Sequence, residues 1–89
     1  MGTADYVVVD LDNDQKKAVL HYAPFFVTDK VTKGDLLNVR KKWIRFNPQK
    51  FPEVIGELCH HINRCKKREL FYFLDELIDH LESFQEPLR

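Results

Sequence analysis

The sequence predicts a small α+β domain in which an N-terminal β-hairpin packs on three α-helices. β-branched residues gather near the start of the chain, turn-forming residues follow them, and apolar residues recur at helical spacing from about residue 32. The 89 residues suffice for one domain. We therefore treat 1–89 as a single domain with a flexible N-terminus (1–5), a β-hairpin region (6–27) and a helical region (32–84).

The hairpin prediction depends on three consecutive stretches. YVVVDL, from Tyr6, predicts a strand because so short a β-branched run does not fill a helix. DNDQ, residues 12–15, is typical of a turn, since Asn and Asp tolerate unusual backbone angles. KAVLHY, residues 17–22, alternates well enough to return as the second strand before Pro24. A rival interpretation places a helix cap at Asn13 and a helix over DQKKAVLHY.

Three helices are expected in the second half. The first, from about 33 to 45, follows an approximate capping box of Thr32 and Asp35. It would turn five apolar residues inward: Leu36, Leu37, Val39, Trp43 and Ile44. The second begins at Pro52 after a short turn. Its buried stripe is Val54, Ile55, Leu58, Ile62 and Cys65.

The last helix, residues 66 to 84, has the clearest periodicity in the chain. Its seam consists of Leu70, Leu74, Leu77, Leu81 and Phe84. No Gly or Pro separates it from the preceding helix. One continuous rod is therefore the alternative.

The aspartates Asp10, Asp12 and Asp14 raise the question of metal chemistry. A strand that ends in Asp-x-Asp resembles the nucleophile motif of haloacid-dehalogenase-like phosphatases, but this resemblance covers only the opening strand. Those enzymes need a further Lys, later acidic residues and a parallel sheet for which this chain is too short. An EF-hand loop would need Gly and Glu where Gln15 and His21 stand. We interpret these aspartates as a hairpin turn and keep metal-dependent hydrolysis at Asp10 and Asp12 as a third hypothesis.

We expect a non-enzymatic protein without metal or cofactor. In CHHINRC, only His61 and Cys65 share a helix face, whereas a zinc site needs about four ligands. Ser83 is the only serine, and no glycine-rich phosphate loop is present. No apolar run approaches the roughly 20 residues of a membrane span. Two closely spaced cysteines fit a reducing compartment, so we expect a cytoplasmic protein.

The charge pattern and the last helix together predict protein binding. Residues 69–86 contain six acidic residues and no Lys or Arg. This helix has more large apolar side chains than one stripe requires, which favours a regulatory or adaptor protein that binds another protein or a second copy of itself. The acidic row would steer a basic partner. The predicted partner-binding residues are Phe71, Phe73, Leu74, Leu77, Ile78 and Leu81. The simpler explanation is that the rest of the fold covers them.

Nucleic-acid binding is the alternative function. NVRKKWIRFNPQK interleaves basic and aromatic residues, and the short turn between the first and second expected helices could be helix-turn-helix-like. The residues concerned are Arg40, Lys41, Lys42, Arg45 and Lys50. A second basic cluster comprises Arg64, Lys66, Lys67 and Arg68. Against this alternative, the formal net charge is zero and the last helix would repel phosphate.

Overall fold

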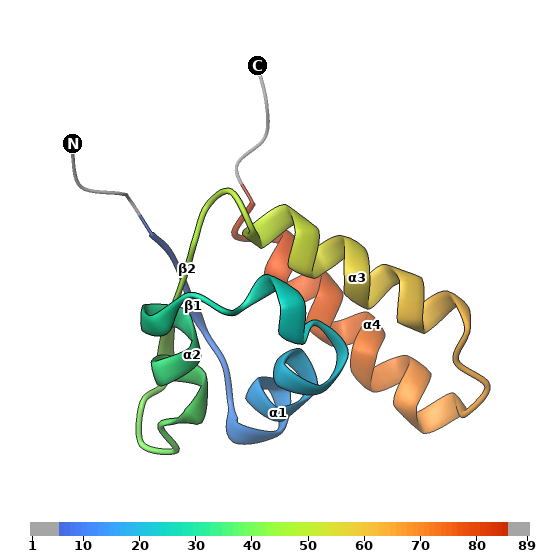
Figure 1. The fold of residues 1–89 in the computed structure, drawn as a ribbon. Helices are drawn as coiled ribbons and strands as arrows, with labels where there is room; N and C mark the ends of the chain where they lie inside the picture. Colours follow the sequence, from blue (N-terminus) through green and yellow to red (C-terminus); the bar gives the residue numbers. More distant parts are fainter. Residues whose placement is uncertain (1–5, 86–89) are drawn as a thin grey trace.

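A computed structural model describes residues 6–85 and confirms the α+β class (Figure 1). The expected flexibility of residues 1–5 lies outside the described residues. The described part contains a two-stranded antiparallel sheet, four α-helices and one 3₁₀ turn. In chain order these are β1 (Val7–Asp10), α1 (Asn13–Tyr22), η1 (Pro24–Phe26), α2 (Lys30–Leu37), β2 (Trp43–Phe46), α3 (Phe51–Asn63) and α4 (Arg68–Glu82).

The predicted second strand of the hairpin region is wrong, because residues 13–22 form α1. A capping box starts this helix: the Asp12 carboxylate accepts a hydrogen bond from the Gln15 N–H at 2.8 Å, and the Gln15 side chain accepts one from the Asp12 N–H at 3.0 Å. These bonds satisfy backbone donors that a turn would leave to water. The rival helical interpretation is therefore confirmed, with Asp12 in place of Asn13 as the cap.

The predicted helix over 33–45 is also wrong beyond Leu37. The Asp29 carboxylate, and not Thr32, caps α2 by accepting a hydrogen bond from the Thr32 N–H at 3.4 Å. The helix ends at Leu37, which is exposed together with Val39, although both were expected inside. Five residues then lead into β2.

Strand β2 takes the place that the sequence assigned to the returning strand of the hairpin. It runs antiparallel to β1, with Val9 opposite Ile44 and Val7 opposite Phe46. Ile44 and Phe46 are buried while Trp43 is exposed. This period of two was mistaken for one face of a helix, because a short apolar segment fits both patterns.

Asp35 ties α2 to β2. Its carboxylate accepts hydrogen bonds from the Arg45 backbone N–H at 2.9 Å and from the Arg45 guanidinium at 2.9 and 3.0 Å. The Lys41 ammonium lies 3.1 Å away. Thr32 donates a hydrogen bond to the Arg45 carbonyl at 2.6 Å. Both outward-facing backbone groups of Arg45 are thereby satisfied by α2, which protects this edge of the sheet.

Lys16 anchors the segment between α2 and β2. Its side chain is almost fully buried, and its ammonium donates hydrogen bonds to the carbonyls of Asn38 and Lys41, both at 2.6 Å. A buried charge is costly unless its donors are bonded in this way. In the sequence, Lys16 lies between the expected turn (12–15) and the expected strand (17–22), and no structural role was predicted for it.

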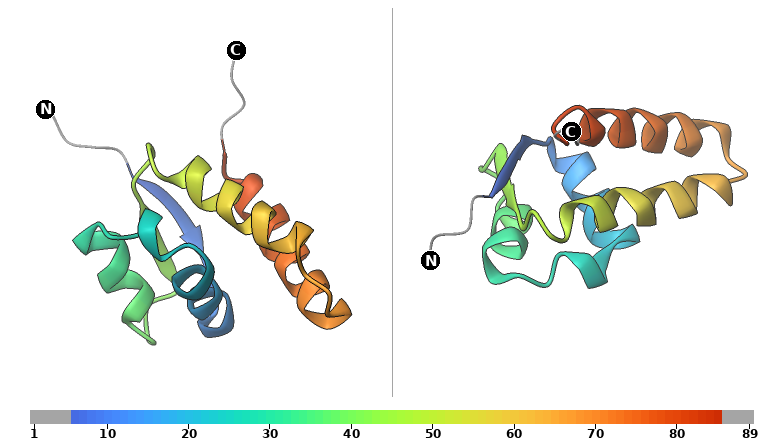
Figure 2. Two further views of the ribbon diagram at one scale, coloured as in Figure 1. Left: turned by 45° about the vertical axis from the view of Figure 1, so that its right-hand side comes forward. Right: turned by 90° about the horizontal axis from the view of Figure 1, so that it is seen from above.

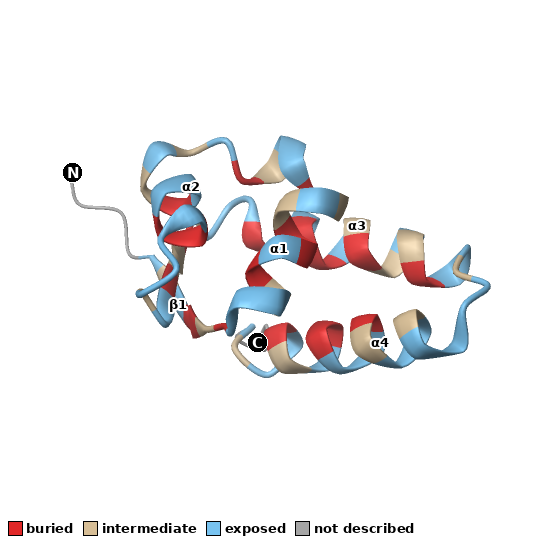
Figure 3. Ribbon diagram, turned by 90° about the horizontal axis from the view of Figure 1, so that it is seen from below, coloured by how far each residue is buried: buried red, intermediate tan, exposed pale blue. Residues whose placement is uncertain are grey.

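The α3–α4 hairpin is confirmed as two separate helices. It packs beside α1 and the sheet and extends beyond them at its closed end (Figure 2). The Phe46 and Phe51 rings, 5.2 Å apart, join β2 to the start of α3. His80 of α4 contacts the backbone carbonyl of Asp10 at 2.8 Å and so joins α4 to β1. Buried residues line the facing sides of α1, α3 and α4 (Figure 3).

No helix within residues 6–85 combines the length and the apolar character that crossing a membrane requires. Two of the three aspartates of the opening motif, Asp10 and Asp12, have structural partners. Asp12 caps α1, and the Asp10 carboxylate lies 3.2 Å from His80. The predicted turn is thus a helix start.

The Asp35 contacts predict a pH-dependent stability. Burial alone would raise the pKa of Asp35, but the hydrogen bonds from Arg45 and Lys41 outweigh it and lower the pKa from 3.8 to about 2. Because the folded state prefers the ionised form, its contribution is present above pH 4 and is lost as the pH falls towards 2. We expect Asp35→Asn to lower the free energy of unfolding at pH 7 by about 2 kcal/mol.

Denaturant unfolding at a series of pH values measures this difference. Asp75→Asn is the matched control, because Asp75 is exposed on α4, and its effect should stay within about 0.5 kcal/mol. A difference between wild type and Asp35→Asn that stays constant from pH 7 down to 2 would contradict the assigned role.

Candidate functional site

The structure divides the predicted partner-binding residues between core and surface. Leu74, Leu77, Ile78 and Leu81 are buried in the core. Phe73 is half-buried, and Phe71 is exposed to 40%. Packing within the fold therefore buries four of the six residues. For these four, the simpler explanation holds, in which the rest of the fold covers the apolar surface of the helix.

The outer face of α4 carries the predicted acidic row. Asp75, Glu76, Asp79 and Glu82 are all exposed. Tyr72 is exposed to 60% next to this row, although the sequence analysis did not select it. The acidic row and the buried leucines lie on opposite sides of the helix, as its amphipathic pattern requires.

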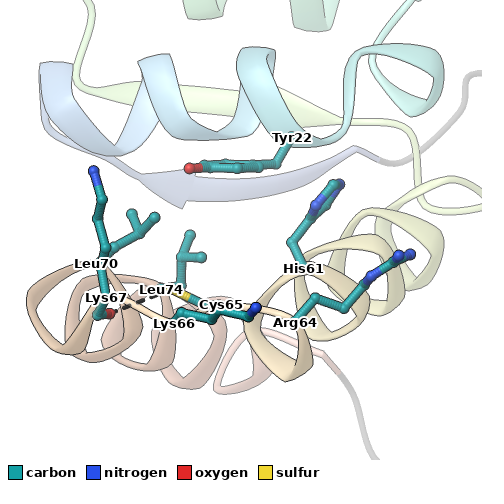
Figure 4. A pocket seen from close by; sticks show the side chains of 8 residues that line it. All are labelled: Tyr22, His61, Arg64, Cys65, Lys66, Lys67, Leu70 and Leu74. Atoms are coloured by element: carbon teal, nitrogen blue, oxygen red, sulfur yellow. Dashed lines mark hydrogen bonds between the residues drawn. The ribbon is translucent and has the colours of Figure 1, made fainter.

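A pocket opens at the closed end of the α3–α4 hairpin, where α1 ends. Its volume is about 490 Å³, and it lies between Tyr22 of α1, the end of α3 and the first turns of α4. Leu70 and Leu74 point from α4 towards the ring of Tyr22, which bounds the pocket on the other side (Figure 4). The Tyr22 ring in turn packs on His61, with 5.0 Å between the ring centroids.

The pocket exists because the α3–α4 hairpin extends past α1. Leu70 occupies a seam position of α4 but is only half-buried, since no element of the described chain lies over it beyond Tyr22. The four residues that connect α3 to α4, Arg64 to Lys67, line the open side. The Cys65 thiol donates a hydrogen bond to the Lys67 carbonyl at 3.3 Å and thereby holds this turn.

The rim of the pocket is basic. Its lining contains Arg64, Lys66 and Lys67 besides His61, and no Asp or Glu. Within residues 6–85, none of the three Lys and Arg side chains forms an ion pair with a carboxylate. Arg64 contacts only the His60 ring, at 3.2 Å. The pocket thus combines an apolar floor, formed by Tyr22, Leu70 and Leu74, with unpaired positive charge at its rim.

The basic segment over residues 40–50 is arranged differently from the expectation. Arg45 and Lys41 both pair with Asp35, and Lys50 lies 4.0 Å from Glu53. Arg40 and Lys42 lie in the segment that leads into β2 and line a second hollow of about 350 Å³. No helix presents these residues, so the helix-turn-helix-like arrangement is wrong.

The cysteines and histidines of CHHINRC do not converge on one point. His61 pairs with Glu57 at 3.3 Å, and both cysteines are free thiols. Among residues 6–85, no cluster of three or more His, Cys, Asp or Glu side chains could hold a metal ion. Cys59 packs against the core, whereas Cys65 faces the pocket.

Comparison with known proteins gives no match: no family model fits the chain, and no curated protein or solved structure resembles it significantly.

The pocket was only partly visible in the sequence. The cluster at residues 64–68 was recognised as basic, and Leu70 and Leu74 as part of an apolar seam. Tyr22 could not be placed beside them, because it was assigned to a strand. A capping-box reading of Asp12 and Gln15 was the signal that would have put Tyr22 at the end of a helix.

The two cysteines test whether the pocket is open. We expect iodoacetamide to modify Cys65 before Cys59, because Cys65 faces the open pocket. Burial, together with the nearby charge of Glu82, raises the pKa of the Cys59 thiol and so lowers its reactive thiolate fraction. Mass spectrometry of peptides sampled over time gives both rates. In denaturant the two rates should converge, and faster modification of Cys59 in the folded protein would contradict this arrangement.

Proposed function

We propose that this protein binds another protein and acts as a non-enzymatic regulatory or adaptor domain. The observation that supports the proposal is the apolar floor of Tyr22, Leu70 and Leu74 at the end of the α3–α4 hairpin. Leu70 and Leu74 belong to the first turns of the predicted C-terminal helix, and Tyr22 belongs to α1. The pocket volume of about 490 Å³ lies in the range of small-molecule binding sites, about 300–1,000 Å³, so the pocket is large enough to take the anchoring side chain of a partner.

Two exposed aromatic residues project from neighbouring faces of the same turns of α4, outside the pocket lining. Phe71 and Tyr72 follow Leu70 directly on α4, and their rings lie 5.9 Å apart. Aromatic side chains are enriched where proteins bind each other, because each contributes a large apolar area with few rotatable bonds. The surface that we propose therefore centres on the first half of α4. A cytoplasmic setting agrees with the two free thiols.

Nucleic-acid binding through residues 40–50 remains the alternative, with less support. Two of its five basic residues are engaged by Asp35, and no helix presents the segment. A mobility-shift titration with DNA and RNA at low and high salt tests it. Salt-sensitive binding that is lost in Arg40→Ala/Lys42→Ala would favour this alternative over protein binding.

Affinity capture from the native host tests protein binding at the pocket. We expect Leu70→Asp to reduce the yield of the specific partner by about tenfold or more, because a charge on the apolar floor disrupts an anchoring contact. Phe25→Asp is the matched control. Phe25 is exposed to 82% on η1, outside the pocket lining, so the same change of charge should leave capture unaffected.

Leu70 is half-buried, so the thermal melting of each variant is compared with that of the wild type. A second test needs no substitution in the floor. Alkylation of Cys65 with N-ethylmaleimide, in a Cys59→Ala protein, adds a bulky group at the pocket and should also prevent capture. Undiminished capture by both the folded Leu70→Asp protein and the alkylated protein refutes the proposal.

A further inference from the structure

The pocket rim contains positive charge that the fold does not neutralise. Lys66 and Lys67 stand immediately before α4, and Arg64 stands at the end of α3. No carboxylate of residues 6–85 forms an ion pair with any of the three. The other basic group of this size, around β2, is different in this respect, because Asp35 engages two of its members.

The helix termini distinguish these cations from one another. Arg64 lies at the C-terminus of α3, where the helix dipole stabilises a positive charge, so the fold by itself accounts for it. Lys66 and Lys67 lie at the N-terminus of α4, where the dipole opposes a positive charge. Neither side chain caps the helix, since Lys67 at the cap position makes no capping hydrogen bond. Their charges therefore contribute no stabilisation to α4.

The charges at both ends of α4 match its dipole only in part. Lys66 and Lys67 precede a first turn that contains Glu69, and Asp79 and Glu82 share the last two turns with His80. The pocket lies at the basic end, away from the acidic row. The acidic row would attract a basic partner, whereas the basic rim of the pocket would not. Charge complementarity at the pocket favours an acidic partner, because opposite charges across an interface steer and orient the encounter.

We infer that the pocket accepts an acidic peptide segment, in which an apolar anchoring side chain is flanked by Asp or Glu. The anchor packs mainly on Tyr22 and Leu70, above the buried Leu74, and the flanking carboxylates pair with Lys66 and Lys67. This inference rests on the proposed function, since it names the chemistry of the partner at the same pocket. Both recognition elements are needed: the apolar floor provides contact area, and the unpaired ammonium groups select the sign of the charge.

Four synthetic peptides test the inference against the purified full-length protein. The first has a central Phe flanked by Asp and Glu. The second replaces the flanking acids with Ser, the third replaces them with Lys, and the fourth keeps the acids but replaces Phe with Gly. Binding is followed by the NMR shifts of the Leu70 and Leu74 methyl groups at low and high salt.

We expect the acidic Phe peptide to bind at least about tenfold more tightly than the Ser and Lys peptides at low salt, and to lose most of this advantage near 0.5 M salt. The Lys66→Glu/Lys67→Glu protein should reverse the preference in favour of the Lys peptide. The Arg40→Glu/Lys42→Glu protein is the matched control. It undergoes the same change of net charge outside the pocket and should keep the original preference.

Several outcomes overturn the inference. Equal binding of the acidic and Ser peptides shows that charge is not recognised, and equal binding of the Phe and Gly peptides shows that the floor is not used. An equal effect of the two double variants shows that only net charge matters. Absence of binding by all four peptides also overturns it. In each case the proposed function stands if Leu70→Asp still prevents capture of the partner, so the two failures are distinguishable.

Discussion

The arrangement of the N-terminal half depends on the contact between the Asp35 carboxylate and Arg45. A two-stranded sheet has two edges, and the edge of β2 would expose the backbone N–H and carbonyl of Arg45. Asp35 and Thr32 of α2 bind these two groups, and the guanidinium of Arg45 neutralises the buried carboxylate. The same contacts therefore place α2 against the sheet and hold β2 in register with β1. Without the guanidinium, a buried carboxylate would be too costly to keep ionised.

Lys16 extends this arrangement to α1. Its ammonium binds the carbonyls of Asn38 and Lys41, so the segment that returns the chain from α2 to β2 is attached to the first helix. Lys41 in turn reaches Asp35. Polar contacts thus organise the half of the molecule with the short elements, whereas the α3–α4 hairpin is held by apolar packing. The apolar seams of α3 and α4 pack on each other, so only part of the hairpin has to be covered by α1 and the sheet. The hairpin can therefore extend past α1. The uncovered part contains the pocket.

Elements with one clear local pattern were predicted correctly from the sequence, whereas segments that fit both a helix and a strand pattern were predicted wrongly. The seam from Leu70 to Leu81 predicted α4 because several turns of regular spacing cannot be fitted by a strand. Residues 17–22 and 43–46 are short and apolar, so strand and helix patterns fitted both, and each was assigned to the wrong class. For the candidate site, the basic cluster and the leucines were recognised separately. That both groups lie around one pocket with Tyr22 became clear only once residues 13–22 were known to form α1.

The sequence by itself determined the α+β class, the helical character of the C-terminal third and the separation of charge along the chain. These features depend on neighbouring residues and on periodicity, which a single sequence contains. Only the tertiary structure decided which segment pairs with β1, which leucines of α4 are used by the core, and which cations remain unpaired. Each of these depends on contacts between residues far apart in the chain. Asp35 shows the reason: one carboxylate turns Lys41 and Arg45 from candidate ligand-binding groups into structural ones, and leaves Lys66 and Lys67 as the cations available at an apolar pocket.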